Sequence, residues 1–121
     1  MKLQFEQAAL NTVTAYGDDY VEVNRVRYHH ALLLAPEGPV ERWPAEGEAG
    51  FAAQSLRALL ERAPEIVLLG TGARQRFPHP SVTAPLLSAR VGVEVMDTQA
   101  ACRTYNILMS EGRRVLAVLL L

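Results

Sequence analysis

Three apolar runs decide the fold of this chain: EIVLL at residues 65–69, VGVEVM at residues 91–96 and VLAVLLL at residues 115–121. Each run has the length of a buried β-strand. The stretches between them have helical spacing, which predicts one helix over about 81–89 and another over about 97–112. This β-α-β-α-β order indicates parallel strands, right-handed crossovers and helices on the faces of the sheet.

The residues ahead of these runs have the pattern of short strands and turns. We predict strands around 13–16, 20–23 and 40–43 and a longer strand over 26–34, which are separated by Gly, Asp, Asn and Pro residues. Together they indicate an antiparallel β-meander over about 12–44. Apolar residues at helical spacing from Phe51 to Ala63 predict a first helix, which begins an α/β portion over about 51–121.

Length and composition place limits on the class of protein. The chain has 121 residues, of which 50% are hydrophobic and 21% charged, so we expect one globular domain over 1–121. Its net charge of −1 argues against a nucleic-acid partner. The longest apolar run is too short to span a membrane, and the first residues lack the apolar core of a signal peptide. We therefore expect no integral membrane span and a cytoplasmic location, which the single cysteine also fits.

Two predicted loops leave the carboxyl ends of parallel strands, where ligands collect in open α/β sheets. One contains Gly70, Thr71, Gly72 and Arg74, and the other contains Asp97 and Thr98. Glycines let the backbone approach an anion, and an arginine adds charged donors. A sharp structural turn explains the same glycines, and we place that interpretation ahead of an anion site.

We find no pattern that indicates catalytic residues, a metal site or a cofactor. Cys102 lies on the apolar stripe of its predicted helix and has no histidine near it in sequence, so we interpret it as a buried structural thiol rather than a nucleophile. His29 and His30 are neighbours on a strand and point to opposite faces, so they cannot bind one ion together. Trp43 has two open interpretations, an exposed anchor for a partner or a residue that seals the core.

Glu94 is unusual because it lies in a strand that is otherwise apolar. If helices cover its face of the sheet, an unpaired carboxylate there is costly. We therefore expect an ion pair with Arg74, Arg103 or Arg114, and take Glu94 and Arg114 as the candidate structural pair. A general base is the less favoured alternative.

Longer strings in the second half resemble a known family. They are EVMDT at 94–98, ACRTYN at 101–106 and EGRRV at 111–115, supported by Gly70–Gly72, Phe77-Pro78, Tyr16-Gly17 and Trp43-Pro44. From about Thr14 to Leu121 the chain resembles a small family of uncharacterised domains. This family includes single-domain bacterial and archaeal proteins and the mitochondrial NADH dehydrogenase (complex I) assembly factor 3.

The resemblance implies a layered α/β fold with a mixed central sheet beside a small β-meander. It also implies a family in which no enzymatic activity is established. The family pattern is matched here by Gly70, Gly72, Asp97, Thr98, Arg103, Thr104 and Asn106. We expect this cluster to form a binding surface at the strand ends.

Our first hypothesis is a non-enzymatic binding or assembly protein that acts through protein–protein contacts, linked by resemblance to respiratory-complex assembly. The alternative is a small-molecule or anion-binding protein, or a modest enzyme, with its site near Gly70, Gly72 and Thr98. A third possibility is a homodimer in which the exposed edge of the meander pairs with its copy.

Overall fold

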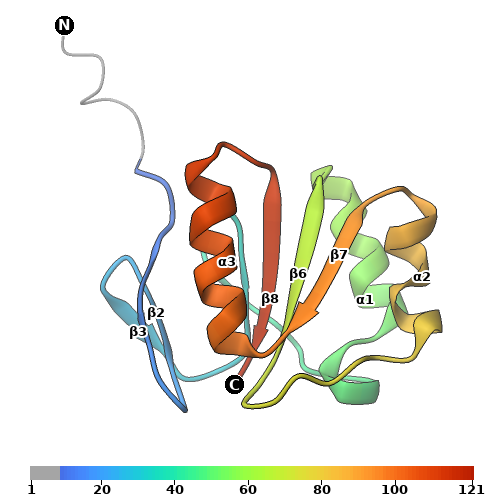
Figure 1. Cartoon of the computed structure of the whole chain (residues 1–121), viewed down its shortest axis with the longest axis horizontal. Coiled ribbons are helices and arrows are strands. Elements are labelled where there is room, and N and C mark those ends of the chain that lie inside the picture. The colour runs from blue at the N-terminus through green and yellow to red at the C-terminus, as the bar shows by residue number, and fades with distance from the viewer. Residues whose placement is uncertain (1–8) are drawn as a thin grey trace, which may run out of the picture.

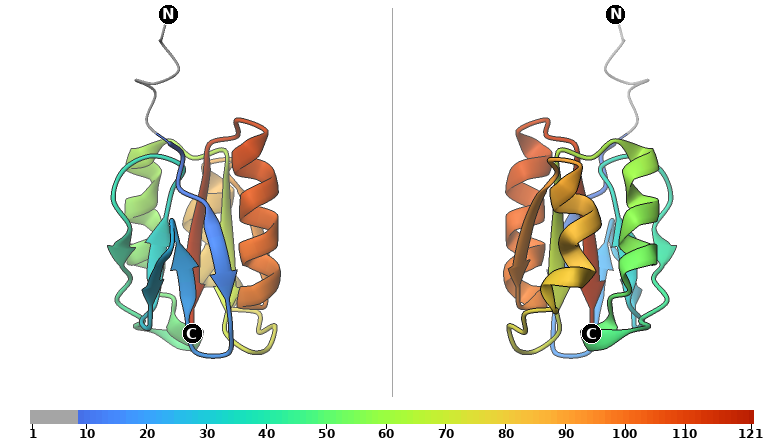
Figure 2. Two further views of the ribbon diagram at one scale, coloured as in Figure 1. Left: turned by 90° about the vertical axis from the view of Figure 1, so that its left-hand side faces the viewer. Right: turned by 90° about the vertical axis from the view of Figure 1, so that its right-hand side faces the viewer.

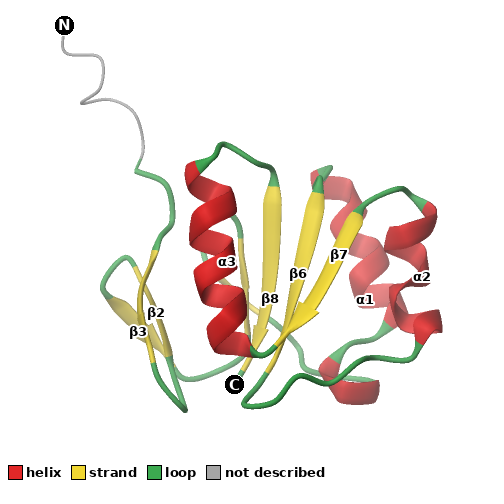
Figure 3. Ribbon diagram, viewed as in Figure 1, coloured by secondary structure: helices red, strands yellow, loops and turns green. Residues whose placement is uncertain are grey.

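The computed structural model describes residues 9–121, apart from the side chain of Glu48, and contains two β-sheets and three α-helices (Figures 1 and 3). The larger sheet has five strands in the order β5-β4-β8-β6-β7. Its strands are β4 (Leu32–Leu34), β5 (Glu41–Arg42), β6 (Ile66–Thr71), β7 (Gly92–Met96) and β8 (Val115–Leu120). β6 lies between β7 and β8 and is parallel to both, whereas β4 is antiparallel to β8 and to β5. The central sheet is therefore mixed, as predicted.

Helices cover both faces of this sheet. They are α1 (Ala53–Ala58), which continues into the 3-10 turn η3 (Leu59–Arg62), α2 (Pro80–Ser88) and α3 (Thr98–Ser110). α3 packs on one face, and α1 and α2 lie together on the other (Figures 1 and 2). The β-α-β-α-β prediction for the second half of the chain is thus confirmed.

A smaller antiparallel sheet contains β1 (Val13–Tyr16), β2 (Val21–Val23) and β3 (Val26–Tyr28), in that order. The predicted meander was too long, because residues 32–34 and 41–42 belong to β4 and β5 of the central sheet. The strand predicted over 26–34 is two strands, β3 and β4, and His29 and His30 lie between them rather than on a strand. β4 lies in the central sheet because its leucine side chains are buried on both faces of the strand. Leu32 and Leu34 belong to the core beneath α3, and Leu33 belongs to the core beneath α1 and α2. A strand with apolar residues on both faces needs cover on both sides, which only the central sheet provides.

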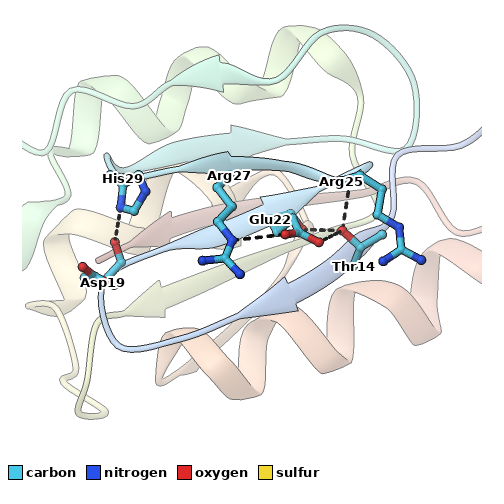
Figure 4. Close-up of polar contacts among 6 residues, drawn as sticks. All are labelled: Thr14, Asp19, Glu22, Arg25, Arg27 and His29. Atoms are coloured by element: carbon cyan, nitrogen blue, oxygen red, sulfur yellow. Dashed lines mark hydrogen bonds and ion pairs between the residues drawn. The ribbon is translucent and has the colours of Figure 1, made fainter.

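The small sheet presents a polar face away from the core. Figure 4 shows polar contacts of Thr14, Glu22 and Arg27 on its strands and of Asp19, Arg25 and His29 in the adjoining loops. The Glu22 carboxylate accepts hydrogen bonds from the Thr14 hydroxyl at 2.8 Å and from Arg27 Nε at 3.3 Å. The Thr14 hydrogen bond, with help from Arg27, lowers the pKa of Glu22. We interpret these contacts as a solvated network that holds neighbouring strands of the small sheet together.

Candidate functional site

A polar pocket of about 430 Å³ lies at the carboxyl ends of β6 and β7. The loop after β6 leads toward α2 on one face, and the loop after β7 leads directly into α3 on the other. Open α/β sheets bind ligands at such a divergence. The pocket is lined by Gly72, Asp97, Thr98 and Arg103 from the predicted set, together with Gly17 and Asp18 from the turn between β1 and β2. The fold therefore brings these predicted residues together.

Protein groups already use the hydrogen-bonding atoms at the base of this pocket. The amide of Gly72 donates to Thr98 Oγ1 at 2.8 Å, and the amide of Thr98 donates to the Gly72 carbonyl at 2.9 Å. The Thr98 hydroxyl donates in turn to the carbonyl of Leu120. Asp97 caps α3 by accepting a hydrogen bond from the amide of Ala100 at 2.9 Å. These bonds close the two loops onto each other.

The glycines have conformational and packing reasons to be there. Gly72 has a φ of +93°, which residues with a Cβ rarely adopt. A Cβ on Gly70 would lie 3.1 Å from the Cα of Thr98, so glycine allows the close approach of β6 and α3. The buried Thr71 accepts a hydrogen bond from the amide of Arg76 at 3.0 Å. Arg74 is exposed and lies outside the residues that line the pocket.

Two of the predicted site residues on α3 fasten the small sheet to the helix. Asn106 accepts a hydrogen bond from the Val13 amide and donates one to the Val13 carbonyl, both at 2.9 Å. Arg103 donates to the Tyr16 hydroxyl at 2.9 Å, and this bond raises the pKa of Arg103. The buried Tyr105 hydroxyl donates to the Asn11 carbonyl at 2.8 Å. Thr104 is half-buried and lies outside the lining of the pocket.

The predicted buried pair of Glu94 and Arg114 is wrong. β7 is the edge strand of the sheet, and Glu94 is exposed there. The three ion pairs found within residues 9–121 join other side chains. Arg114 instead donates from Nε to the Ala63 carbonyl and from its backbone amide to Glu65. The expectation failed because it placed a helix over a position that the edge of the sheet leaves open.

Trp43 and His79 both have structural roles. Trp43 is 6% exposed and donates from Nε1 to the Gly50 carbonyl at 3.2 Å, so of its two interpretations the residue that seals the core is correct. His79 caps α2 by accepting a hydrogen bond from the amide of Ser81.

Cys102 is fully buried between α3 and the sheet, and this desolvation raises the pKa of its thiol to about 12. Because the thiolate is the reactive form, we expect native protein at pH 8 to resist iodoacetamide. Protein unfolded in guanidinium chloride should be alkylated completely, and mass spectrometry measures both extents. Alkylation of native protein at the rate of a free thiol would contradict this prediction.

An apolar groove of about 660 Å³ lies between α2 and β7, and it was not predicted from the sequence. Its walls include Phe77 and Leu87, which are 74% and 56% exposed, and the half-buried side chains of Val93 and Val95. The position of Leu87 was a signal for this groove. The buried positions of α2 are Val82 and Leu86, four residues apart, and Leu87 is an apolar residue outside that buried stripe.

No helix within residues 9–121 is long and apolar enough to cross a membrane. In the same part of the chain, no three His, Cys, Asp or Glu side chains are grouped so that they could hold a metal ion.

Solved structures with this fold include bacterial proteins of substantial sequence identity. A crystal structure of a protein from Bordetella parapertussis is 58% identical, with a TM-score of 0.87 over 93% of this chain and 97% of that one. An NMR structure of a Mth938-like domain from Bordetella pertussis is 49% identical, with a TM-score of 0.80 over 94% of this chain and 87% of that one.

Curated relatives differ in name. The mouse NADH dehydrogenase (ubiquinone) 1 alpha subcomplex assembly factor 3 is 42% identical over 115 residues, which are 93% of this chain and 60% of that protein. The 13 kDa major membrane protein of Francisella tularensis is 30% identical over 99 residues, covering 81% of this chain and 80% of that one. The family model for proteins of unknown function DUF498/DUF598 matches residues 13–120, and this chain belongs to that family.

Proposed function

We propose that this chain is a non-enzymatic binding or assembly protein, and that its partner proteins bind at the groove between α2 and β7. The observation that carries the proposal is the pair of exposed apolar side chains, Phe77 and Leu87, beside β7, the last strand of the sheet within residues 9–121. Relatives named as NADH dehydrogenase assembly factors support an assembly role. A link to respiratory-complex assembly is part of the proposal.

The groove has the composition of a protein-binding surface. Single exposed apolar residues are common, but here Phe77 and Leu87 share one depression with Pro78, Val93 and Val95. An aromatic side chain at such a position is a typical anchor for a partner. Partner binding would remove this apolar surface from water, which is the main driving force of association.

The alternative, a small-molecule or anion site at the strand ends, has less support. An anion would need free amides there, and the amides of Gly72 and Thr98 are bonded within the protein. The Asp97 carboxylate also occupies the N-terminus of α3, where an anion would otherwise be favoured. These contacts favour the protein-binding proposal.

The proposal is tested by affinity capture with three immobilised proteins: the unchanged chain, Leu87→Glu and Ile107→Glu. Ile107 is 58% exposed on α3 and matches Leu87 in exposure, so it controls for a new surface charge. Extracts from the source organism should include detergent-solubilised membranes. We expect the unchanged chain and Ile107→Glu to retain the same proteins, and Leu87→Glu to lose them at least tenfold.

Equal retention by Leu87→Glu, with an unchanged melting temperature, would contradict the proposal, as would the absence of any specific protein on the unchanged chain. Subunits of NADH dehydrogenase among the retained proteins would support the respiratory link. A specific set without them would remove that link and leave the binding role.

A further inference from the structure

Resting on that proposed function, we infer that the partner presents an extended segment that adds to β7 as a further strand of the five-stranded sheet. Its apolar side chains would enter the groove beside Leu87, and a Lys or Arg would lie across from Glu94. The occupant is thus an extended peptide in which apolar residues alternate with basic ones.

The backbone of β7 is oriented for such an addition. In the part of the chain that the structure describes, β7 pairs with β6 on one side and is the last strand of the sheet. The amide of Gly92 donates to the Glu65 carbonyl at 3.0 Å, so Gly92 faces β6. Backbone groups alternate in direction along a strand, so those of Val93 and Val95 face the free edge. They supply the amides and carbonyls that a further strand would bond.

The two faces of β7 specify the side chains of the added strand. The side chains of Val93 and Val95 belong to the core beneath α1 and α2, and they form the floor of the groove. Side chains of an added strand that point the same way would contact Phe77 and Leu87. Successive side chains of a strand point to opposite faces, so the intervening ones would lie beside Glu94.

The negative charge of Glu94 favours a partner segment with basic residues. Glu94 is exposed and takes part in none of the ion pairs found within residues 9–121, so a basic side chain on the neighbouring strand would gain a favourable cross-strand contact. A second copy of this chain is a poorer occupant. β7 has only five residues, so two-fold pairing of β7 with itself puts the two Glu94 carboxylates opposite or diagonal to each other.

The Gln75 side chain covers part of the outer edge of β7. Its Nε2 donates to the Val95 carbonyl at 3.0 Å, which occupies an acceptor that the added strand would use. Natural proteins cover exposed edges in this way to prevent unwanted pairing. Binding must displace the Gln75 amide, so removing it should strengthen binding by a strand and leave any other mode of docking unchanged.

The test is an NMR titration of the full chain with three blocked eight-residue peptides. One alternates valine with lysine, one alternates valine with glutamate, and one is the lysine peptide with N-methylated central amides. We expect the lysine peptide to shift the amides of Val93 and Val95 and to bind Gln75→Ala about threefold to tenfold more tightly. N-methylation should abolish binding. Glu94→Lys, a surface change, should reverse the preference to the glutamate peptide, each preference being about threefold to fivefold.

Three results would each overturn strand addition: no shift of the β7 amides at millimolar lysine peptide, equal binding of the N-methylated peptide, or unchanged affinity in Gln75→Ala. If any of these occurs while Leu87→Glu still loses the captured proteins, the groove binds partners by another mode and the proposed function stands. If capture does not depend on Leu87, the proposed function itself fails.

Discussion

Replacing Asn106 with alanine is expected to lower the free energy of unfolding by about 2–4 kcal/mol, which corresponds to a melting temperature about 10 °C lower. The substitution removes both hydrogen bonds that join α3 to the backbone of Val13, at 2.9 Å each. Val13 is 6% exposed, so its amide and carbonyl would lose their partners where water has little access. Urea unfolding followed by circular dichroism measures the effect.

Ser110→Ala is the control for Asn106→Ala, because Ser110 is exposed on the same helix and its hydroxyl donates to the Ile107 carbonyl within that helix. Its effect should stay within about 0.5 kcal/mol. Asn106→Asp keeps the acceptor for the Val13 amide but turns a carboxylate oxygen toward the Val13 carbonyl, so it should also destabilise. Asn106→Ala as stable as the unchanged protein would show that the small sheet is held without this contact.

Thr98→Val is the second large expected effect, with a loss of about 2–3 kcal/mol. Valine keeps the shape of threonine but removes the oxygen that accepts from the Gly72 amide at 2.8 Å and donates to the Leu120 carbonyl. Thr98 is 5% exposed, so water replaces these bonds poorly. The amide of Gly72 should also exchange with deuterium faster, as measured by NMR.

Two further variants test whether the loss of stability in Thr98→Val comes from the missing hydroxyl. Thr98→Ser restores the hydroxyl and should recover most of the stability. Thr104→Val makes the same substitution in the same helix. Thr104 is half-buried, and its hydroxyl takes part in none of the hydrogen bonds found within residues 9–121. This variant should therefore change the free energy of unfolding little. If Thr98→Val and Thr104→Val cost the same, the hydroxyl of Thr98 does not hold the loops together.

The hydrogen bonds of α3 distinguish its side of the molecule from the side that carries α2. α3 is bonded on one side to the small sheet through Asn106 and Arg103, and at its start to the loop after β6 through Thr98. The α2 side has no further element over the β7 edge in the part of the chain that the structure describes. Asn106, Thr98 and Arg103 were predicted as part of a binding surface, but they hold elements of the fold together. The groove that we propose for partners lies between α2 and β7.

The α/β half of the fold followed from local patterns. The runs at 65–69, 91–96 and 115–121 are strands, and the helix predicted over about 97–112 is α3, Thr98–Ser110. The burial of Cys102 was predicted from its place on the apolar stripe of that helix, and the structure leaves it fully buried. Such features depend on the spacing of apolar residues within one element, which a sequence displays directly.

The sequence by itself determined the helices and the parallel strands of the second half, because apolar periodicity and turn residues act over a few neighbouring positions. Only the tertiary structure decided that Leu32–Leu34 join the central sheet, that Glu94 lies at an open edge, and that Phe77 and Leu87 border a groove. These outcomes depend on which strands end up side by side. Strand order is set by burial across the whole molecule, since each strand occupies the position where both of its faces find the cover that they need.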